Sequence, residues 1–524
     1  MKRPGGIRAP FALAFALAGC VVSPPYAPPT PPVGATAPLV SVDRTVETTG
    51  EAPDAWWRLY DDPNFDGYIR QAFLANDDLR IAEYDLATAR ALLDQSRAGL
   101  YPSTQLVSST VRGRDPVTNE ILEFTGRKPI TIWLFEDVLD VSYELDLFGR
   151  VRNTIRAQRS DAEVSQATRD SVRITVAAET ARAYAQICTL GEEIDVAEQS
   201  LAIVTNEANI SLRQLQAGGG SEFDVVRAQA LVAQTQSTIP ALEGQRRSAL
   251  FQLAALLGRT PSNAPTEALA CRTAPKLKSL IPVGDGAALL RRRPDVRLAD
   301  RRIAGAAARL GVATADLYPR ILLTGFYGGA APNAAELVHF PGLVWGVGPR
   351  ITWDFPNQIA ARARVRAATS AEAASIASFD STVLTALKET EQALASYSAT
   401  LQQRTSLAET EVKARRAYEI AHNSFLAGAT PELDLLTAEQ TFISAAAAVA
   451  AADSALAQDQ IQLFKALGGG WRNEEANTGS LMPSADVPSA ESPDGSKVKA
   501  VIAAPADRLP SPGGVREPTS AQNR

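Results

Sequence analysis

The stretch LRIAEYDLATARALLDQSRAGLYPSTQL at residues 79–106 is echoed by VRLADRRIAGAAARLGVATADLYPRILL at residues 296–323. The two stretches are offset by 217 residues, and each places a helix-like apolar pattern before Leu-Tyr-Pro and a strand-like run. A second echo relates AGGGSEFDVVRAQ at 217–229 to AGATPELDLLTAE at 427–439. Short-repeat arrays have periods of about 20–50 residues, so this spacing predicts one fold made of two similar halves.

Each half should contain two strands followed by a long helical hairpin. We predict a mostly α-helical protein with a small β part, with a first repeat at 56–271 and a second repeat at 272–471. The expected strands lie at about 103–112, 136–148, 319–328 and 343–355, and the expected hairpins at 150–257 and 357–467.

The hairpins follow from two long segments without proline, at about 150–217 and 357–427. A helix of ~68 residues would be ~100 Å long at ~1.5 Å per residue, which no compact domain requires. Each segment ends at a glycine-containing turn, after which a shorter helix returns. Small residues such as those at 445–452 favour close side-by-side packing into a sheet or cylinder of helices over a free-standing coiled coil.

The predicted strands have one apolar face. In 138–148, Leu139, Val141 and Tyr143 alternate with Asp140 and Ser142. This alternation fits a soluble sheet over a core, and it also fits a membrane barrel with lipid outside and water inside. Four strands cannot close a barrel, since the smallest have about eight, so a membrane reading requires several chains. Three chains would supply twelve strands.

Composition and motifs exclude several function classes. The net charge of −6 is evenly spread, without the basic stripe of a nucleic-acid-binding protein. The two histidines, His339 and His422, lie far apart, and no Cys/His cluster has metal-ligand spacing. Nucleophile-elbow, P-loop and dinucleotide-binding motifs are missing from the sequence. We therefore expect no enzyme activity and no metal site.

The N-terminus reads as an export signal at 1–19 followed by a Pro-rich linker at 20–55. Lys2, Arg3 and Arg8 precede a short apolar run that is too short to span a bilayer. The run ends in Leu-Ala-Gly-Cys, which resembles the bacterial lipobox, so Cys20 is expected to carry a covalent lipid. An ordinary signal peptide with an incidental cysteine is the alternative. The tail at 472–524 is predicted to be disordered.

Several motifs together resemble the outer-membrane efflux protein family, the TolC-like channels, in its lipoprotein branch that includes NodT and OprM. They are WWRLYDDPNFDGYIRQAFLANDDLRIA at 56–82, ALLRRRPDVRLADRRI at 288–303, ADLYP at 315–319 and LFKALGGGW at 463–471.

The resemblance implies a homotrimer in the outer membrane of a Gram-negative bacterium, with a twelve-stranded barrel above a periplasmic helical barrel. It implies that a periplasmic adaptor and an inner-membrane pump of the resistance-nodulation-division class are partners. It also implies that outer-membrane lipid surrounds the strands. No cofactor is expected, apart from the covalent lipid on Cys20. The expected function is an exit duct for small molecules.

By the same resemblance, the turns of the two hairpins form a periplasmic gate. Asp434 matches an inward acid of the family, and Asp224 is its repeat mate. Three copies of Asp434 around a narrow axis would attract cations. Either aspartate could instead cap or stabilise its own helix N-terminus. Thr437 stands where relatives can carry a second acid, and Leu433 is a candidate apolar constriction or a core residue.

The turns are also the expected docking point for the adaptor. Ala217, Gly218, Ala427 and Gly428 leave room for close backbone approach. A turn that simply requires a positive φ would select the same glycines. In one departure from the family, Phe425 replaces a tyrosine that in some relatives bonds across to the neighbouring hairpin.

Cys188 and Cys271 are candidates for a disulfide. Cys188 lies ~44 Å along its helix from the first hairpin turn, and the return helix climbs ~54 Å before the loop that contains Cys271. The two heights are similar, and export would expose both thiols to an oxidising compartment.

Besides the exit duct for small molecules, the sequence leaves two further hypotheses open. The same channel fold could serve type I protein secretion or metal-ion efflux; the content of two Met and two His weakly disfavours metal. A periplasmic structural coiled-coil lipoprotein without a pore is a third hypothesis. The alternating strands at 138–148 and 344–355 argue against it.

Overall fold

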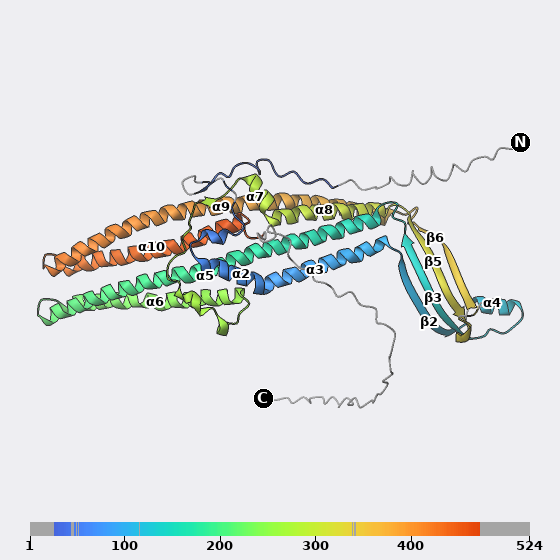
Figure 1. Ribbon diagram of the computed structural model, residues 1–524, viewed down its shortest axis with the longest axis horizontal. Helices are drawn as coiled ribbons and strands as arrows, with labels where there is room; N and C mark the ends of the chain where they lie inside the picture. Colours follow the sequence, from blue (N-terminus) through green and yellow to red (C-terminus); the bar gives the residue numbers. More distant parts are fainter. Residues whose placement is uncertain are drawn as a thin grey trace, which may run out of the picture. The chain divides into compact units, whose positions relative to one another are not determined.

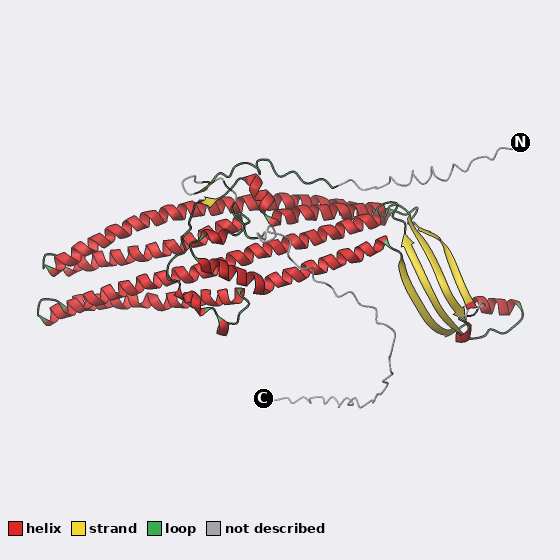
Figure 2. Ribbon diagram, in the orientation of Figure 1, coloured by secondary structure: helices red, strands yellow, loops and turns green. Residues whose placement is uncertain are grey.

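The structure, a computed structural model, describes residues 26–42, 47–48, 50, 52–114, 116–337, 339 and 342–471. The predicted signal peptide at 1–19, the lipid site at Cys20 and the predicted tail at 472–524 lie outside the described residues. Long helices and a four-stranded sheet dominate the described part (Figure 2). The expectation of a mostly helical protein with a small β part is confirmed.

The long helices and strands occur in the predicted order in both repeats. The helices are α2 (Pro63–Ala75), α3 (Asp77–Arg97), α4 (Pro116–Phe124), α5 (Arg150–Gln216), α6 (Glu222–Leu256), α7 (Gly286–Arg292), α8 (Pro294–Ala315), α9 (Ile359–Leu426) and α10 (Glu432–Ala466). The strands are β1 (Glu47–Thr48), β2 (Ser103–Gly113), β3 (Ile132–Glu144), β4 (Ile281–Pro282), β5 (Arg320–Ala331) and β6 (Leu343–Thr352).

The two longest helices, α5 and α9, contain 67 and 68 residues and turn back into α6 and α10. Positive φ angles at Gly218 and Gly428, 79° and 72°, end them. Only glycine adopts this left-handed conformation without strain, so the turns fall where the sequence has glycine. The tips of both hairpins lie at one end of the helices, and the sheet follows the other end (Figure 1).

The hairpins are joined along α5 and α10, and α3 and α8 both pack against α5. Aromatic residues from distant motifs build the core at mid-length. Trp56 is fully buried and stacks on Phe464 with ring centroids 4.9 Å apart. A Cβ on Gly469 would lie 2.9 Å from Trp56, so the glycine run after α10 makes room for the indole. The first and last motifs therefore meet in one core.

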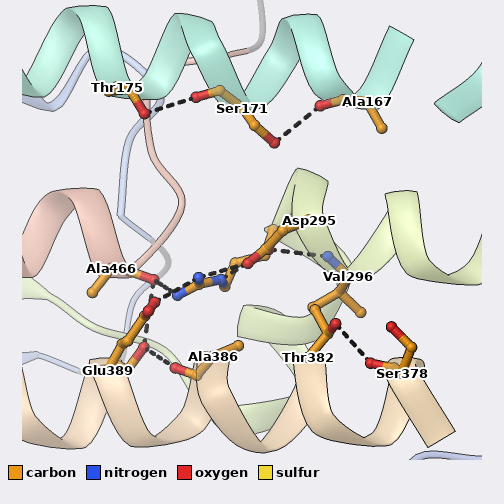
Figure 3. A network of polar contacts seen from close by, with 12 residues as sticks. Ala167, Ser171, Thr175, Asp295, Val296, Ser378, Thr382, Ala386, Glu389 and Ala466 are labelled. Carbon is orange, nitrogen blue, oxygen red and sulfur yellow. Dashed lines mark hydrogen bonds and ion pairs between the residues drawn. The ribbon is translucent and has the colours of Figure 1, made fainter. Parts of the chain in front are cut away.

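Arg293, in the run of three arginines before α8, is a buried tie between three helices. Its guanidinium donates to the Ala466 carbonyl at 3.0 Å and to carboxylates of Asp295 and Glu389 at 2.7 and 2.8 Å. Figure 3 shows Asp295, Glu389 and Ala466 converging on this contact. A buried arginine is tolerated when its donors are satisfied, and here they hold α8 and α9 to the end of α10.

The four long strands form an antiparallel sheet in the order β2-β3-β5-β6. The predicted strand 136–148 is wrong at both ends, because β3 spans Ile132–Glu144. At its start, β3 pairs Ile132 with Gly113. Beyond its end, Asp146 accepts backbone N–H groups of Val151 and Arg152 at 2.9 and 3.0 Å, which uses this segment to cap α5.

Two further boundaries differ from prediction. The strand expected to end at 328 continues to Ala331, because Gly328 allows close pairing: a Cβ there would lie 2.1 Å from the Asp137 carbonyl oxygen. The strand expected at 343–355 stops at Thr352, since Thr352 pairs with Arg320, the first residue of β5. The segment between β2 and β3 contains α4.

The described part of the Pro-rich linker runs beside α8 and α9 (Figure 1). Tyr26 bonds to Asp300 on α8, and the N–H groups of Val40 and Ser41 donate to Glu391 on α9 at 2.7 and 2.9 Å. Charged and backbone contacts therefore hold the linker against the second repeat.

One helix of the described chain, α10, is long and apolar enough to cross a membrane by length and composition. Its apolar character comes largely from alanine, and it packs along α9 and α5 as a helix of the hairpin.

Candidate functional site

The sheet exposes an apolar face. The register aligns one residue from each strand in a row across it: Leu106, Leu139, Tyr327 and Trp345. Leu106 is 72 % exposed and Trp345 is 69 % exposed. Large side chains at this exposure make a patch that a soluble monomer rarely leaves uncovered.

The opposite face is mixed and includes Asp140 and Phe326. One of its rows, three residues along each strand from the apolar row, consists of Ser103, Ser142, Thr324 and Gly348. Successive side chains of a strand point to opposite faces, so this row is separated from the apolar one by the sheet itself. A row of hydroxyls and glycine suits contact with water.

The two outer strands of the sheet, β2 and β6, each have one edge without a partner strand among the described residues. They run in opposite directions, because each successive pair in the order is antiparallel. Unpaired edges are templates for pairing with another chain. If β6 of one copy pairs with β2 of the next, the up-and-down alternation continues unbroken.

At the far end of the helices, the hairpin turns are open to solvent. Ala217, Gly218, Ala427 and Gly428 are all exposed, and a Cβ at either glycine would meet no atom within 4 Å. These four residues lie at corresponding places in the two repeats and offer backbone surface without bulky side chains.

The two candidate gate aspartates differ. Asp224 is half-buried and takes part in a capping arrangement: its N–H donates to the Ser221 hydroxyl at 3.3 Å, and that hydroxyl donates back to its carboxylate at 2.6 Å. Asp434 is exposed in the first turn of α10, and no side-chain bond of its carboxylate occurs within the described residues. Ser221 therefore caps α6 and Asp224 supports that cap, while the Asp434 carboxylate is exposed and could face a ligand or a sister chain.

The other gate candidates separate in the same way. Leu433 is 52 % exposed and does not pack in the core of its own chain. Thr437 is exposed, and its hydroxyl donates to the Leu433 carbonyl at 2.7 Å. Leu436 and Phe425 are buried. Asp434, Leu433 and Thr437 thus share the exposed side of the start of α10.

At mid-length, Cys188 on α5 and Cys271 form a disulfide, with their Cα atoms 4.7 Å apart. Arg246 on α6 reinforces this join, donating to the carbonyls of Ile187, Leu269 and Cys271 at 3.0, 2.7 and 2.6 Å. Burial lowers the pKa of Arg246, yet three carbonyls satisfy its donors. Among the described residues, the one grouping of three potential metal ligands is Asp62 with these cysteines, whose sulfurs are bonded to each other.

Sequence reasoning missed a buried acidic pair near the tips, Glu207 on α5 and Glu439 on α10. Their exposed fractions are 2 % and 0 %. A signal existed, because Glu439 lies on the same helical stripe as Leu435, Leu436 and Phe442, which are all buried. A carboxylate in an apolar stripe is a candidate functional residue.

The sequence of this chain is similar to those of known outer-membrane proteins. A sequence model described as outer membrane efflux protein matches residues 68–259 and 287–469. The pyoverdine export outer membrane protein OpmQ of Pseudomonas putida is 27 % identical over 460 residues, covering 85 % of this chain and 94 % of its own. Nodulation protein T of Rhizobium leguminosarum biovar viciae is 27 % identical over 462 residues, covering 88 % and 92 %.

Among solved structures, the outer-membrane channel OprN superimposes with a TM-score of 0.80 at 32 % identity, covering 86 % of this chain and 100 % of OprN.

Proposed function

The chain belongs to the outer membrane efflux protein family, and from that premise we propose that it is the outer-membrane exit duct of a tripartite efflux system for small molecules. The observation that carries the proposal is the sheet, with an exposed apolar row on one face and a row of hydroxyls and glycine on the other. Lipid would cover the first face and water the second.

We further propose that three chains form one channel. One chain supplies four long strands with two free edges, and barrels need about eight strands or more to close. Pairing β6 of each copy with β2 of the next keeps the antiparallel order and removes every edge. The open face of the hairpins would close into the periplasmic tunnel in the same step. Cys20 would anchor each chain to the membrane through its lipid.

The tips would carry two roles. The exposed Asp434, Leu433 and Thr437 at the start of α10 would line the narrow periplasmic end, while Asp224 supports its own helix. The small exposed residues at both turns, from Ala217 to Gly218 and from Ala427 to Gly428, would receive a periplasmic adaptor. That adaptor would couple the duct to an inner-membrane pump of the resistance-nodulation-division class.

Two measurements on the purified full chain test this function. Native mass spectrometry in detergent should give a mass of three chains, and the same sample should form discrete single-channel steps in a planar lipid bilayer. A monomer that forms no conductance would contradict the duct and would favour a structural lipoprotein. A trimer that conducts without any adaptor binding would retain the channel but contradict the tripartite assembly.

A further inference from the structure

The buried pair Glu207 and Glu439 lies where the two hairpins touch, close behind the tips. Glu207 is nine residues before the end of α5, and Glu439 is seven residues after the start of α10. At ~1.5 Å per residue these positions are ~14 and ~10 Å from the helix ends. α5 belongs to the first hairpin and α10 to the second, so the pair lies across their junction.

The partners of the two carboxylates are unequal. One oxygen of Glu207 lies 2.7 Å from Nδ1 of His422 and accepts the Tyr418 hydroxyl at 3.4 Å. The second oxygen of Glu207 and both oxygens of Glu439 have no hydrogen-bond partner among the described residues. An ionised carboxylate buried in this way is costly, so Glu439 is accommodated in this packing only while it carries a proton.

Within the part of the chain that the structure describes, Glu439 forms no ion pair with a Lys, Arg or His side chain. Glu207 faces it from α5, and Tyr418 and His422 lie beside Glu207 on α9. Arg415 on α9 is held by Glu411 and over the ring of Phe442, 5.2 Å from its centroid. Burial first, and the charge of Glu207 second, raise the pKa of Glu439 to about 8.

Other contacts also join the two hairpins near this pair. Ser211 on α5 bonds to Glu432 at the start of α10. A small apolar cluster gathers Ala414, Phe442 and Ala445, with Ile203 of α5 packed against it. A repulsion within the acidic pair therefore acts on the same junction that these contacts hold.

We propose that Glu207 and Glu439 form a proton-operated latch between the two hairpins. With the proton on Glu439, and with His422 beside Glu207, the pair is compatible with the packed junction. When the proton leaves Glu439, two negatively charged carboxylates face each other in a site of low polarity, and their repulsion drives α10 away from α5. If the tips are the gate, as the proposed function has it, the latch favours opening when the periplasmic pH rises.

The test measures the junction itself, so it does not depend on conductance. Spin labels are placed at Ala217→Cys and Ala427→Cys. Labelled chains are diluted with unlabelled chains, so that the distance measured is the one within a single chain. The two cysteines of the native disulfide do not take up label. The expected result is a longer label-to-label distance at pH 9 than at pH 6, with a midpoint near pH 8. Glu439→Gln, which has the same shape without the charge, should keep the short distance at both pH values.

Two further variants sharpen the test. Glu207→Gln removes the negative charge beside Glu439. The latch then requires the midpoint of the distance change to move to lower pH or the change to vanish. A midpoint that moves to higher pH would show that another group controls the distance. Glu419→Gln, an exposed acid on α9 paired with Arg416 at 3.0 Å, is the matched control and should behave as the wild type. A distance that does not depend on pH, or a dependence unchanged in Glu439→Gln, would overturn the latch. Bilayer recordings that show no channel would contradict the proposed function alone.

Discussion

Gly191 on α5 faces Arg246 on α6 so closely that a Cβ on Gly191 would lie 2.8 Å from the guanidinium and 2.7 Å from the Cys271 carbonyl oxygen. The glycine leaves the space in which Arg246 ties α5, α6 and the disulfide loop together.

Gly191→Ala should therefore destabilise the protein, although alanine favours a helix. Overpacking of this kind costs ~1–3 kcal/mol, more than the ~0.5–1 kcal/mol gained in helix propensity. Thermal unfolding in detergent, followed by circular dichroism, would measure the loss. The matched control is Gly244→Ala on α6, where a Cβ meets nothing within 4 Å. If both variants are equally stable, the close contact has no energetic weight.

The disulfide should stabilise the middle of the chain. It closes a loop with a sequence separation of 83 residues, for which the chain-entropy estimate is ~4.5 kcal/mol. A reductant should lower the unfolding temperature of the wild type but not that of the double variant Cys188→Ala/Cys271→Ala. Mass spectrometry with and without reductant should show the bond directly, and two free thiols in the untreated protein would contradict it.

Glu391 should hold the linker in a pH-dependent way. Although burial favours its neutral form, the N–H groups of Val40 and Ser41 hold the pKa of Glu391 below its usual range. A lowered carboxyl pKa gives stability that is present above the ordinary range and is lost as the pH falls through the lowered value. Glu391→Gln should therefore speed thermolysin cleavage near Leu39 at neutral pH. Glu409→Gln, an exposed acid paired with Lys413, is the control and should leave the rate unchanged.

Asp434→Ala should raise single-channel conductance and weaken block by divalent cations, because three exposed carboxylates at a constriction attract cations. Asp224→Ala should leave conductance unchanged and cost ~0.3–1 kcal/mol of stability, since it removes the carboxylate that accepts the Ser221 hydroxyl and a negative charge from the first turn of α6. Equal conductance in Asp434→Ala and the wild type would remove Asp434 from the gate.

The faces of the sheet can be distinguished by charge. Val347, on the exposed apolar face, should not accept arginine: Val347→Arg should cost ~2–4 kcal/mol in lipid if it lies near the bilayer centre. Ser142→Arg, on the opposite face, should fold and shift ion selectivity towards anions. Urea unfolding in lipid vesicles and reversal potentials would test the two. Equal tolerance at both positions would argue that the sheet does not span a membrane.

Much of the fold could be predicted because it depends on local pattern. The helical segment at 150–217, free of proline and ended by glycine, became α5. Strand ends were less predictable, since Thr352 ends β6 only because its partner Arg320 begins β5. Likewise, β5 continues beyond the expected end at residue 328 because Gly328 and the residues after it pair with β3.

In the candidate site, too, some features could be predicted from the sequence and others could not. The places of the two turns could be predicted, because both echoed segments begin with Ala-Gly. Asp434 was assigned from the resemblance to the family, and its role at a gate stays a prediction. The distinct environments of Asp224 and Asp434 could not be predicted, since a cap and an exposed carboxylate can occupy equivalent places in two repeats.

By itself, the sequence determined the two-fold repetition, the helical hairpins and the alternation of the strands, because chain periodicity and glycine or proline positions act within a few residues. Only the tertiary structure decided that Glu207 and Glu439 meet in a buried junction, that Arg246 fills the space left by Gly191, and that β2 and β6 present free edges. These features depend on which distant segments lie side by side, and burial and pairing are properties of that arrangement.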